Sequence, residues 1–305
     1  MDAFVALLTG TSALNVELRT FGMAFQGAMT VRNGRNKDKS MDWFYAFCCT
    51  LLTAFAGGIF GFLWMGKPTS LITGGDVTLT LTAIAFVLAT YTPFDIGFKL
   101  GNNIVVTIVT TFFAQLFRAL GMIAFINTAN SEVPPSKYYP TPILGPVLYG
   151  VLLGNMGAFF SKGFDGHLQQ GVPFPIQNGV IIGVLYQLYA NDKVGSMGTS
   201  LRSVVQSTGI QGDMDDKTFA TFCASLFVVV TGILMLPLFL GPAWNPFVAA
   251  TTPVRYAKSI IAPTAKQVGG KPSSEVGDTD TETDDEPTTP VRRKRSKKNS
   301  KKKTN

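Results

Sequence analysis

Two arginines of the sequence, Arg118 and Arg19, lie inside apolar stretches where a charge is costly. Arg118 lies deep in the stretch 102–127, and Arg19 lies near the start of the stretch 13–31. A guanidinium group within a membrane is unfavourable unless it meets water, a carboxylate or a lipid phosphate, so Arg118 is a candidate functional residue. The alternative is that its long side chain reaches toward the nearer helix end. This alternative is stronger for Arg19, which lies closer to an end and has Glu17 as a neighbour.

Glycines interrupt two other apolar stretches. Gly57, Gly58 and Gly61 lie in one stretch, and Gly154 and Gly157 lie in another. Small residues three or four positions apart allow helix backbones to approach closely. They also allow a kink or break whose freed carbonyl groups face a water-filled path. For a single pair of glycines, close packing is the favoured interpretation.

Residue groups typical of catalysis do not occur in the sequence. It has no paired acids within its apolar stretches, no His/Cys cluster, no phosphate-binding glycine loop and no nucleophile elbow. Asp213, Asp215 and Asp216 have the chemistry to bind calcium, but acids that precede a helix more often interact with its N-terminal dipole. The sequence therefore predicts no enzyme, no cofactor and no resident metal.

The elements that carry these residues are predicted to be membrane-spanning helices. Between Trp43 and Thr128 the charged residues are Lys67, Asp76, Asp95, Lys99 and Arg118. A soluble surface needs far more charge, and an apolar run of about 20 residues is long enough to cross a bilayer as a helix. Seven spans are predicted, at residues 13–31, 43–65, 76–96, 102–127, 141–161, 174–190 and 218–240. The expected fold class is all-α, a multispanning membrane protein.

Basic residues predict the orientation in the membrane. Arg32, Arg35, Lys37 and Lys39 form the strongest basic cluster of a short loop, between the first two spans. Such clusters favour the cytoplasmic side. With seven spans, the N-terminus is then extracellular or lumenal and the C-terminus is cytoplasmic.

An internal repeat relates two parts of the helical region. Residues 18–23 (LRTFGM) resemble residues 117–122 (FRALGM) at an offset of 99 positions, and the same offset places Gly58 on Gly157. A register shared by two helices indicates a duplicated three-helix unit. Because three is odd, the copies must be inverted across the membrane, an architecture that places a translocation path at the repeat interface. For glycines at equivalent places we therefore favour the path, and the predicted pore residues are Gly57, Gly58, Gly154, Gly157, Arg19 and Arg118.

Two regions are expected along the chain. A transmembrane domain covers residues 1–242, with repeat one at about 13–98, repeat two at about 102–192 and a seventh helix at about 218–240. Residues 243–305 are expected to be a disordered cytoplasmic tail, since they are polar, then acidic and finally basic. The basic block could bind nucleic acid, but on a multispanning protein we favour contact with anionic lipid headgroups and expect no nucleic-acid partner.

The last four residues have the form of a dilysine signal for retrieval to the endoplasmic reticulum. Lys302 and Lys303 precede Thr304 and Asn305 at the C-terminus. Such a signal acts as a receptor-read address on a cytoplasmic terminus, which the predicted topology supplies. Chance is the alternative, because a lysine-rich tail produces this pattern easily.

Several stretches resemble the trimeric intracellular cation (TRIC) channel family. They are residues 31–68, with the basic loop, Trp43-Phe44, Ala56-Gly57-Gly58-Ile59 and Lys67-Pro68, together with Tyr91-Thr92-Pro93-Phe94-Asp95 and residues 154–160. The likeness covers roughly residues 13–240 and is that of a distant member. It implies seven helices in a three-plus-three-plus-one arrangement. It also implies a homotrimer in endoplasmic or sarcoplasmic reticulum, with a potassium pore in each subunit whose current balances charge during calcium release and uptake.

The resemblance also implies roles for particular residues. In the family, glycine kinks of the second and fifth helices line the pore; here these would be Gly57, Gly58, Gly154 and Gly157. In animal members a lysine and an arginine of the fourth helix contact a phosphoinositide. Only the arginine is present here, as Arg118; the lysine position is Ala114, and the family's glutamate and final lysine are replaced by Gln115 and Gly121. These departures put phosphoinositide regulation of the animal kind in question.

The leading hypothesis is a potassium channel of an intracellular membrane. Open helix ends and polar side chains such as Asn155 and Ser161 would replace part of the hydration of the ion. Arg118 would then lie near the constriction, or outside the path on a lipid headgroup. The alternative is a secondary transporter of a small solute, which is also built on inverted repeats. A third hypothesis is a non-conducting scaffold that binds partners through its charged tail.

Overall fold

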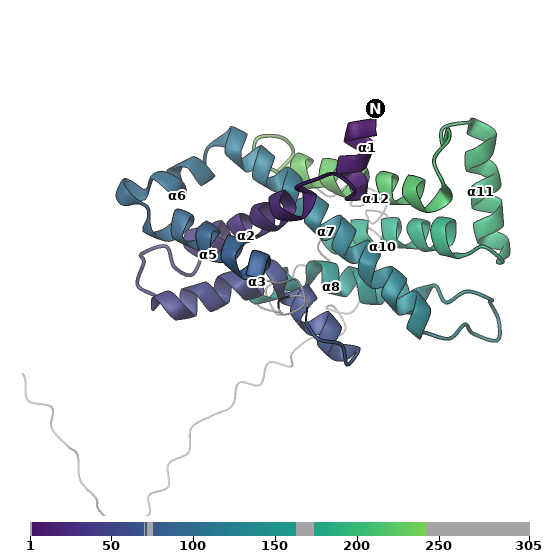
Figure 1. The fold of residues 1–305 in the computed structure, drawn as a ribbon, viewed down its shortest axis with the longest axis horizontal. Coiled ribbons are helices and arrows are strands. Elements are labelled where there is room, and N and C mark those ends of the chain that lie inside the picture. Colours follow the sequence, from purple (N-terminus) through teal and green to yellow (C-terminus); the bar gives the residue numbers. More distant parts are fainter. Residues whose placement is uncertain (1, 70, 72–75, 163–173, 242–305) are drawn as a thin grey trace, which may run out of the picture. The chain divides into compact units, whose positions relative to one another are not determined.

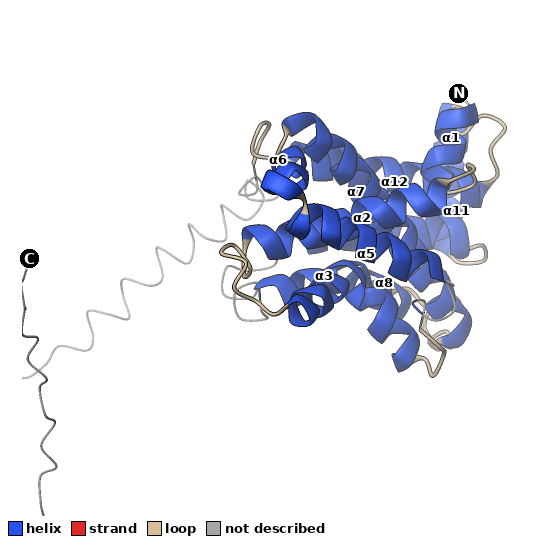
Figure 2. Cartoon of the chain, turned by 60° about the vertical axis from the view of Figure 1, so that its left-hand side comes forward, coloured by secondary structure: helices blue, strands red, loops and turns tan. Residues whose placement is uncertain are grey.

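The computed structural model describes residues 2–69, 71, 76–162 and 174–241, which are almost entirely helical (Figure 1). The helices are α1 (Asp2–Thr9), α2 (Asn15–Asn33), α3 (Trp43–Trp64), α5 (Asp76–Tyr91), α6 (Ile96–Gly101), α7 (Ile104–Glu132), α8 (Leu144–Lys162), α10 (Phe174–Tyr186), α11 (Ser196–Thr208) and α12 (Asp216–Leu234). A 3₁₀ turn, η1 (Pro93–Asp95), precedes α6, and a short π-helix, η2 (Gln187–Asn191), extends α10. No strand occurs within the described ranges (Figure 2), in agreement with the predicted all-α class.

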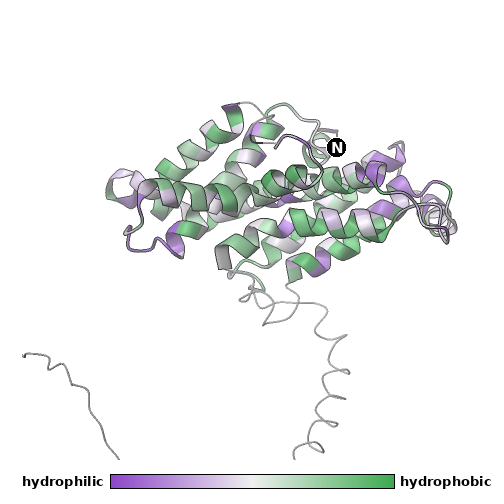
Figure 3. Cartoon of the chain, turned by 90° about the horizontal axis from the view of Figure 1, so that it is seen from below, coloured by the Kyte–Doolittle hydropathy of each residue, from purple (hydrophilic) through white to green (hydrophobic). Residues whose placement is uncertain are grey.

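The predicted spans coincide with α2, α3, α5, α7, α8, α10 and α12. Three of these helices, α3, α7 and α12, are long and apolar enough to cross a membrane, and α5 with α6 makes a fourth if the two count as one span bent by 90°. Figure 3 shows hydrophobic residues along the middle of the helices and hydrophilic residues gathered toward their ends. The structure is that of a helical, multispanning membrane protein, and the count of seven spans stays a prediction.

Helices α1 and α11 lie outside the predicted spans. α11 is amphipathic: Leu201 and Val205 pack against the core formed with α10 and α12, whereas Ser200 and Ser203 are exposed. It crosses the end of the bundle instead of running along it (Figure 1). Hydropathy alone misses such a helix, because half of its surface is polar.

Side-chain caps explain where three helices begin. Asp42 before α3, Asn103 before α7 and Asp215 before α12 each accept a hydrogen bond from a backbone N–H of the first helical turn. Asp215 therefore serves the start of its helix, which is the interpretation favoured for the acids at 213–216.

The contacts between helices divide the bundle into two triplets and one added helix. α2, α3 and α5 pack against one another, and so do α7, α8 and α10, while α12 packs against α7 and α10. Between the triplets, α2 packs against α7 and α3 packs against α8. α2 and α7 are antiparallel, since Gly22 lies beside Phe113 whereas Asn33 reaches Asn102 (3.4 Å) just before α7 begins. Opposed first helices are what inverted triplets require.

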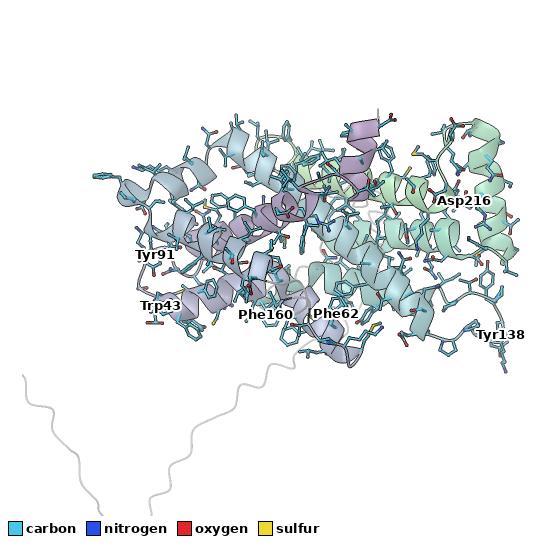
Figure 4. The ribbon with its side chains drawn as sticks, in the orientation of Figure 1. Trp43, Phe62, Tyr91, Tyr138, Phe160 and Asp216 are labelled. Carbon is cyan, nitrogen blue, oxygen red and sulfur yellow. The ribbon has the colours of Figure 1, made fainter. Side chains whose placement is uncertain are left out.

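Exposed aromatic side chains lie at both ends of the bundle (Figure 4). Trp43 and Tyr91 of the first triplet are at one end, and Tyr138, in the loop between α7 and α8, is at the other. Tryptophan and tyrosine are enriched at membrane–water interfaces. The loops that follow the first helix of each triplet therefore lie at opposite ends, as inversion predicts.

The third helix of the first triplet breaks sharply after α5. Pro93 ends the helix, and Phe94 and Asp95 both have positive φ (53° and 56°), a backbone conformation that is unfavourable for side chains of this size. The Asp95 carboxylate lies 2.5 Å from Lys39 Nζ and 3.9 Å from an Arg32 guanidinium nitrogen. These ion pairs attach the bend to the last turn of α2 and to the loop between α2 and α3. The predicted third span therefore ends in a corner instead of a straight final turn.

A buried carboxylate fastens the second triplet at the corresponding place, after η2. Asp192 accepts hydrogen bonds from the hydroxyl groups of Tyr139 (2.6 Å) and Thr141 (2.7 Å) and from the backbone N–H groups of Gly195 (2.9 Å) and Gly198 (3.0 Å). Burial alone raises the pKa of this carboxyl, but the four hydrogen bonds together hold the pKa below its ordinary value. Asp192 thus joins the start of α11 to the loop between α7 and α8.

Replacing Asp192 by Asn is expected to lower the free energy of unfolding by about 2 kcal/mol, because an amide cannot accept hydrogen bonds from four donors as the carboxylate does. Since the folded-state pKa is lowered, the contribution of the carboxylate is complete above the unfolded-state pKa of about 3.9 and is lost as the pH falls through the folded-state value. Thermal unfolding of the purified protein at pH 7 and at acidic pH measures both effects. Asp213→Asn, at an exposed position, is the control, and an unchanged unfolding temperature for Asp192→Asn at pH 7 would contradict the prediction.

Candidate functional site

α3 and α8 are in direct backbone contact at two glycines. A Cβ atom added to Gly57 would overlap the carbonyl oxygen of Leu153, and one added to Gly157 would overlap the carbonyl oxygen of Thr53. Position 57 thus contacts 153 while position 157 contacts 53, so the helices are antiparallel and the two contacts are reciprocal. Only glycine permits this approach, and Cα–H groups facing carbonyl oxygens add a weak attraction.

Both helices continue without a break through these glycines. The structure therefore accounts for Gly57 and Gly157 by close packing. A water-filled path beside them stays a prediction.

A cavity of about 40 Å³ lies beside this crossing. Its lining includes Gly57, Gly58, Gly121, Gly154, Gly157 and Arg118, and the other described side chains that line it are apolar. Four glycines of α3 and α8 are thus brought together with the arginine of α7. Of the predicted pore residues, only Arg19 is not part of this lining.

Arg118 is held by neutral groups. Its guanidinium donates hydrogen bonds to the side-chain carbonyls of Gln115 (2.9 Å) and Asn178 (2.8 Å) and to the backbone carbonyl of Pro175 (3.2 Å). Asn178 in turn donates to the hydroxyl of Thr231 in α12 (3.1 Å). The Nε atom of Arg118 is buried and has no hydrogen-bond partner among the described residues. The charge is therefore positioned by α7, α10 and α12 together, and one of its N–H donors is unused.

The sequence did not single out two residues around Arg118: Asn178, which accepts a hydrogen bond from Arg118, and Thr231, which accepts one from Asn178. Arg118, Asn178 and Thr231 are far apart in the chain and meet only in the fold. Asn178 is 1% exposed. A buried amide inside an apolar span is the signal that could have identified it, because such a group requires a polar partner.

The positions at which the chain departs from the TRIC pattern have clear structural roles. Ala114, at the family's lysine position, is buried where α7 packs against Gly22 of α2. Gln115 accepts the hydrogen bond from Arg118. A Cβ atom added to Gly121 would have no neighbouring atom within 4 Å, so this glycine leaves the space that the cavity occupies.

The other predicted site residues lie apart from this cavity or beyond the described part of the chain. Arg19 lies beside Gly10, at the turn between α1 and α2, and forms no ion pair with Glu17. Asn155 donates to the carbonyl of its own helix at Val151. The side chain of Ser161 and both retrieval-signal residues, Lys302 and Lys303, lie outside the described residues.

Gly57→Ala and Gly157→Ala are each expected to destabilise the protein by about 1–3 kcal/mol, because the added methyl group meets a backbone carbonyl that cannot rotate away. Gly121→Ala is the matched control: its methyl group enters open space, and alanine favours a helix over glycine by up to about 1 kcal/mol. Unfolding temperatures of the three purified variants test the contact. Equal stability of all three would show that α3 and α8 are not packed through these glycines.

Comparisons with known proteins identify the fold. No protein-family model and no curated protein matches the sequence. Solved structures do match. A trimeric intracellular cation channel from C. elegans in the absence of Ca²⁺ is 16% identical with a TM-score of 0.53, and the match covers 77% of this chain and 96% of that chain. The structure of such a channel from C. elegans with bound Ca²⁺ is 16% identical with a TM-score of 0.53, and the match covers 78% of this chain and 96% of that chain. A third structure, described as the structural basis for activity of TRIC counter-ion channels in calcium release, is 15% identical with a TM-score of 0.52, and the match covers 74% of this chain and 94% of that chain. The resemblance predicted from the sequence is confirmed at the level of structure: the chain has the fold of the TRIC channels.

Proposed function

We propose that this chain is a potassium-conducting cation channel of an intracellular membrane, whose current would balance charge during calcium release and uptake. The observation that carries the proposal is the glycine-lined cavity beside Arg118, where the second helices of two inverted triplets meet. Inverted repeats place a translocation path at such an interface. The solved structures of the same fold are described as cation channels, which supports this function.

The cavity is too small to be an open pore. At about 40 Å³ it has room for about three water molecules, taking roughly 10–15 Å³ for each. A conducted ion needs a continuous series of waters or protein oxygens. We therefore infer that the described conformation is closed, and that opening moves α3 against α8 at the contacts of Gly57 and Gly157.

The positions of the acids give less support to a secondary transporter. Coupling to protons or sodium ions typically uses carboxylates within the membrane. In the parts of the chain that the structure describes, each carboxylate lies in a loop or at the end of a helix, as Asp76 and Glu132 do. No specific observation favours this alternative.

Assembly, lipid contacts and location complete the proposal. We propose a homotrimer in the endoplasmic reticulum membrane with a cytoplasmic C-terminus; the solved structures of this fold are described as trimeric, and Lys302 and Lys303 suit retrieval. Membrane lipids are expected to bind the basic tail. A phosphoinositide at Arg118 has less support, because Ala114 stands at the position of the family's lysine.

Purified protein in planar bilayers with a potassium gradient is expected to give unitary cation currents. Arg118→Ala should change the unitary conductance or its dependence on lipid, since this substitution removes the single charged group among the described residues that line the cavity. Saturable solute counterflow without unitary currents would instead identify a transporter. Wild-type conductance and lipid dependence in Arg118→Ala would exclude this residue from the site.

Changing both Lys302 and Lys303 to Ser is expected to move the full-length protein from the endoplasmic reticulum to later compartments, because the retrieval receptor reads these two lysines. Fluorescence microscopy of the tagged protein, with the tag away from the C-terminus, measures the redistribution. Changing Lys297 and Lys298 to Ser removes the same charge farther from the C-terminus and is the control. An equal effect of both pairs would indicate a general role of the basic block.

A further inference from the structure

The charge of Arg118 has no counter-ion among the described residues. Its three hydrogen-bond acceptors are two amide side chains and one backbone carbonyl, all of them neutral. The ion pairs of the described chain involve Arg32, Lys39 and Lys67, and none includes Arg118. A positive charge within a membrane protein is strongly unfavourable without compensation. Neutral carbonyls supply part of this compensation, and the buried Nε donor remains unpaired.

The adjoining cavity has the chemistry to take an anion. Arg118 is the single charged residue of its described lining, and the remaining lining residues are glycine, alanine, leucine, methionine and phenylalanine. Water in a buried site needs two to four polar partners, and among the described side chains of the lining only Arg118 is polar. A cation would be repelled by the guanidinium, whereas an anion would be attracted to it. Glycine Cα–H groups are weak additional donors toward an anion.

We propose that a small monovalent inorganic anion of the chloride class binds in this cavity against Arg118. The bound anion neutralises the guanidinium and accepts the hydrogen bond that Nε cannot make within the protein. The cavity of about 40 Å³ has room for an ion of this size. A consequence, which rests on the proposed channel function, is that cations cross this region only while the anion screens Arg118.

Binding is tested on the purified full-length protein with bromide as the probe, by equilibrium titration in gluconate medium. Wild-type protein should bind bromide saturably, and Arg118→Gln should weaken binding at least about tenfold, because the charge-assisted contact is lost. Gly121→Ala keeps Arg118 and adds a methyl group in the cavity, so it should weaken binding about tenfold while the protein stays folded. Arg35→Gln removes an equal charge from an exposed loop position and should bind as wild type does.

Each other outcome of the titration overturns the proposal. Absence of saturable bromide binding to wild-type protein excludes the site. Binding that neither Arg118→Gln nor Gly121→Ala weakens places the anion elsewhere. Displacement of bromide by vesicles of phosphatidylglycerol, but not by vesicles of phosphatidylcholine, identifies a lipid phosphate instead of a free anion.

The consequence for conduction is measured separately in planar bilayers. Potassium current in potassium chloride should be at least about threefold larger than in potassium gluconate, because an unscreened guanidinium repels a cation strongly where the dielectric is low. Currents that are equal in both salts overturn the screening role of the anion. Saturable bromide binding in a protein without any unitary current would contradict the channel function and leave the anion site standing.

Discussion

The close approach of α3 and α8 is the constraint on which the rest of the structure depends. At Gly57 and Gly157 each helix places a backbone carbonyl where a side chain would otherwise be, and the contact is reciprocal because the helices are antiparallel. No larger residue fits at either position in this conformation, so the two glycines determine how closely the two triplets approach each other here. The cavity lies beside this crossing, lined by Gly58, Gly121 and Gly154 among others, and Gly121 leaves open space there.

One end of each triplet is held by a carboxylate, through ion pairs in the first triplet and through hydrogen bonds in the second. In each triplet a carboxylate that follows the third helix binds the chain near the end of the first helix. Asp95 pairs with Arg32 at the end of α2 and with Lys39 in the loop after it, and Asp192 accepts hydrogen bonds from Tyr139 and Thr141 in the loop after α7. The first contact is between ions and is partly exposed, so salt weakens it. The second is buried and hydrogen-bonded, so it does not depend on a basic partner. Inversion places these fastenings at opposite ends of the bundle.

The sequence predicts those parts of the structure that local patterns determine. Long apolar runs indicate α3, α7 and α12, because this signal lies within single stretches of chain. The repeated glycines drew attention to α3 and α8, but the sequence favoured a path there, whereas the structure shows Gly57 and Gly157 in a close helix contact. The corner at Asp95 was not predicted, since it requires two residues with positive φ that distant basic side chains stabilise. The attachment of Arg118 to Asn178 was not predicted either, because 60 positions separate the two residues and only the tertiary fold brings them together.

The neutral partners of Arg118 explain how a fixed positive charge can remain available inside the bundle. A carboxylate in place of Asn178 would pair with the guanidinium and cancel its charge, leaving the adjoining cavity without an electrostatic preference. Amide and backbone carbonyls orient the same group by hydrogen bonds but leave the full charge in place. Ala114, Gln115 and Gly121 have a similar effect, because the TRIC pattern has charged side chains at these three positions and this chain has none. Arg118 is then the one cation, Gln115 is a neutral partner, and Gly121 leaves open space. The site is thus built around a single orientated charge, and the balance of that charge must come from whatever enters the cavity.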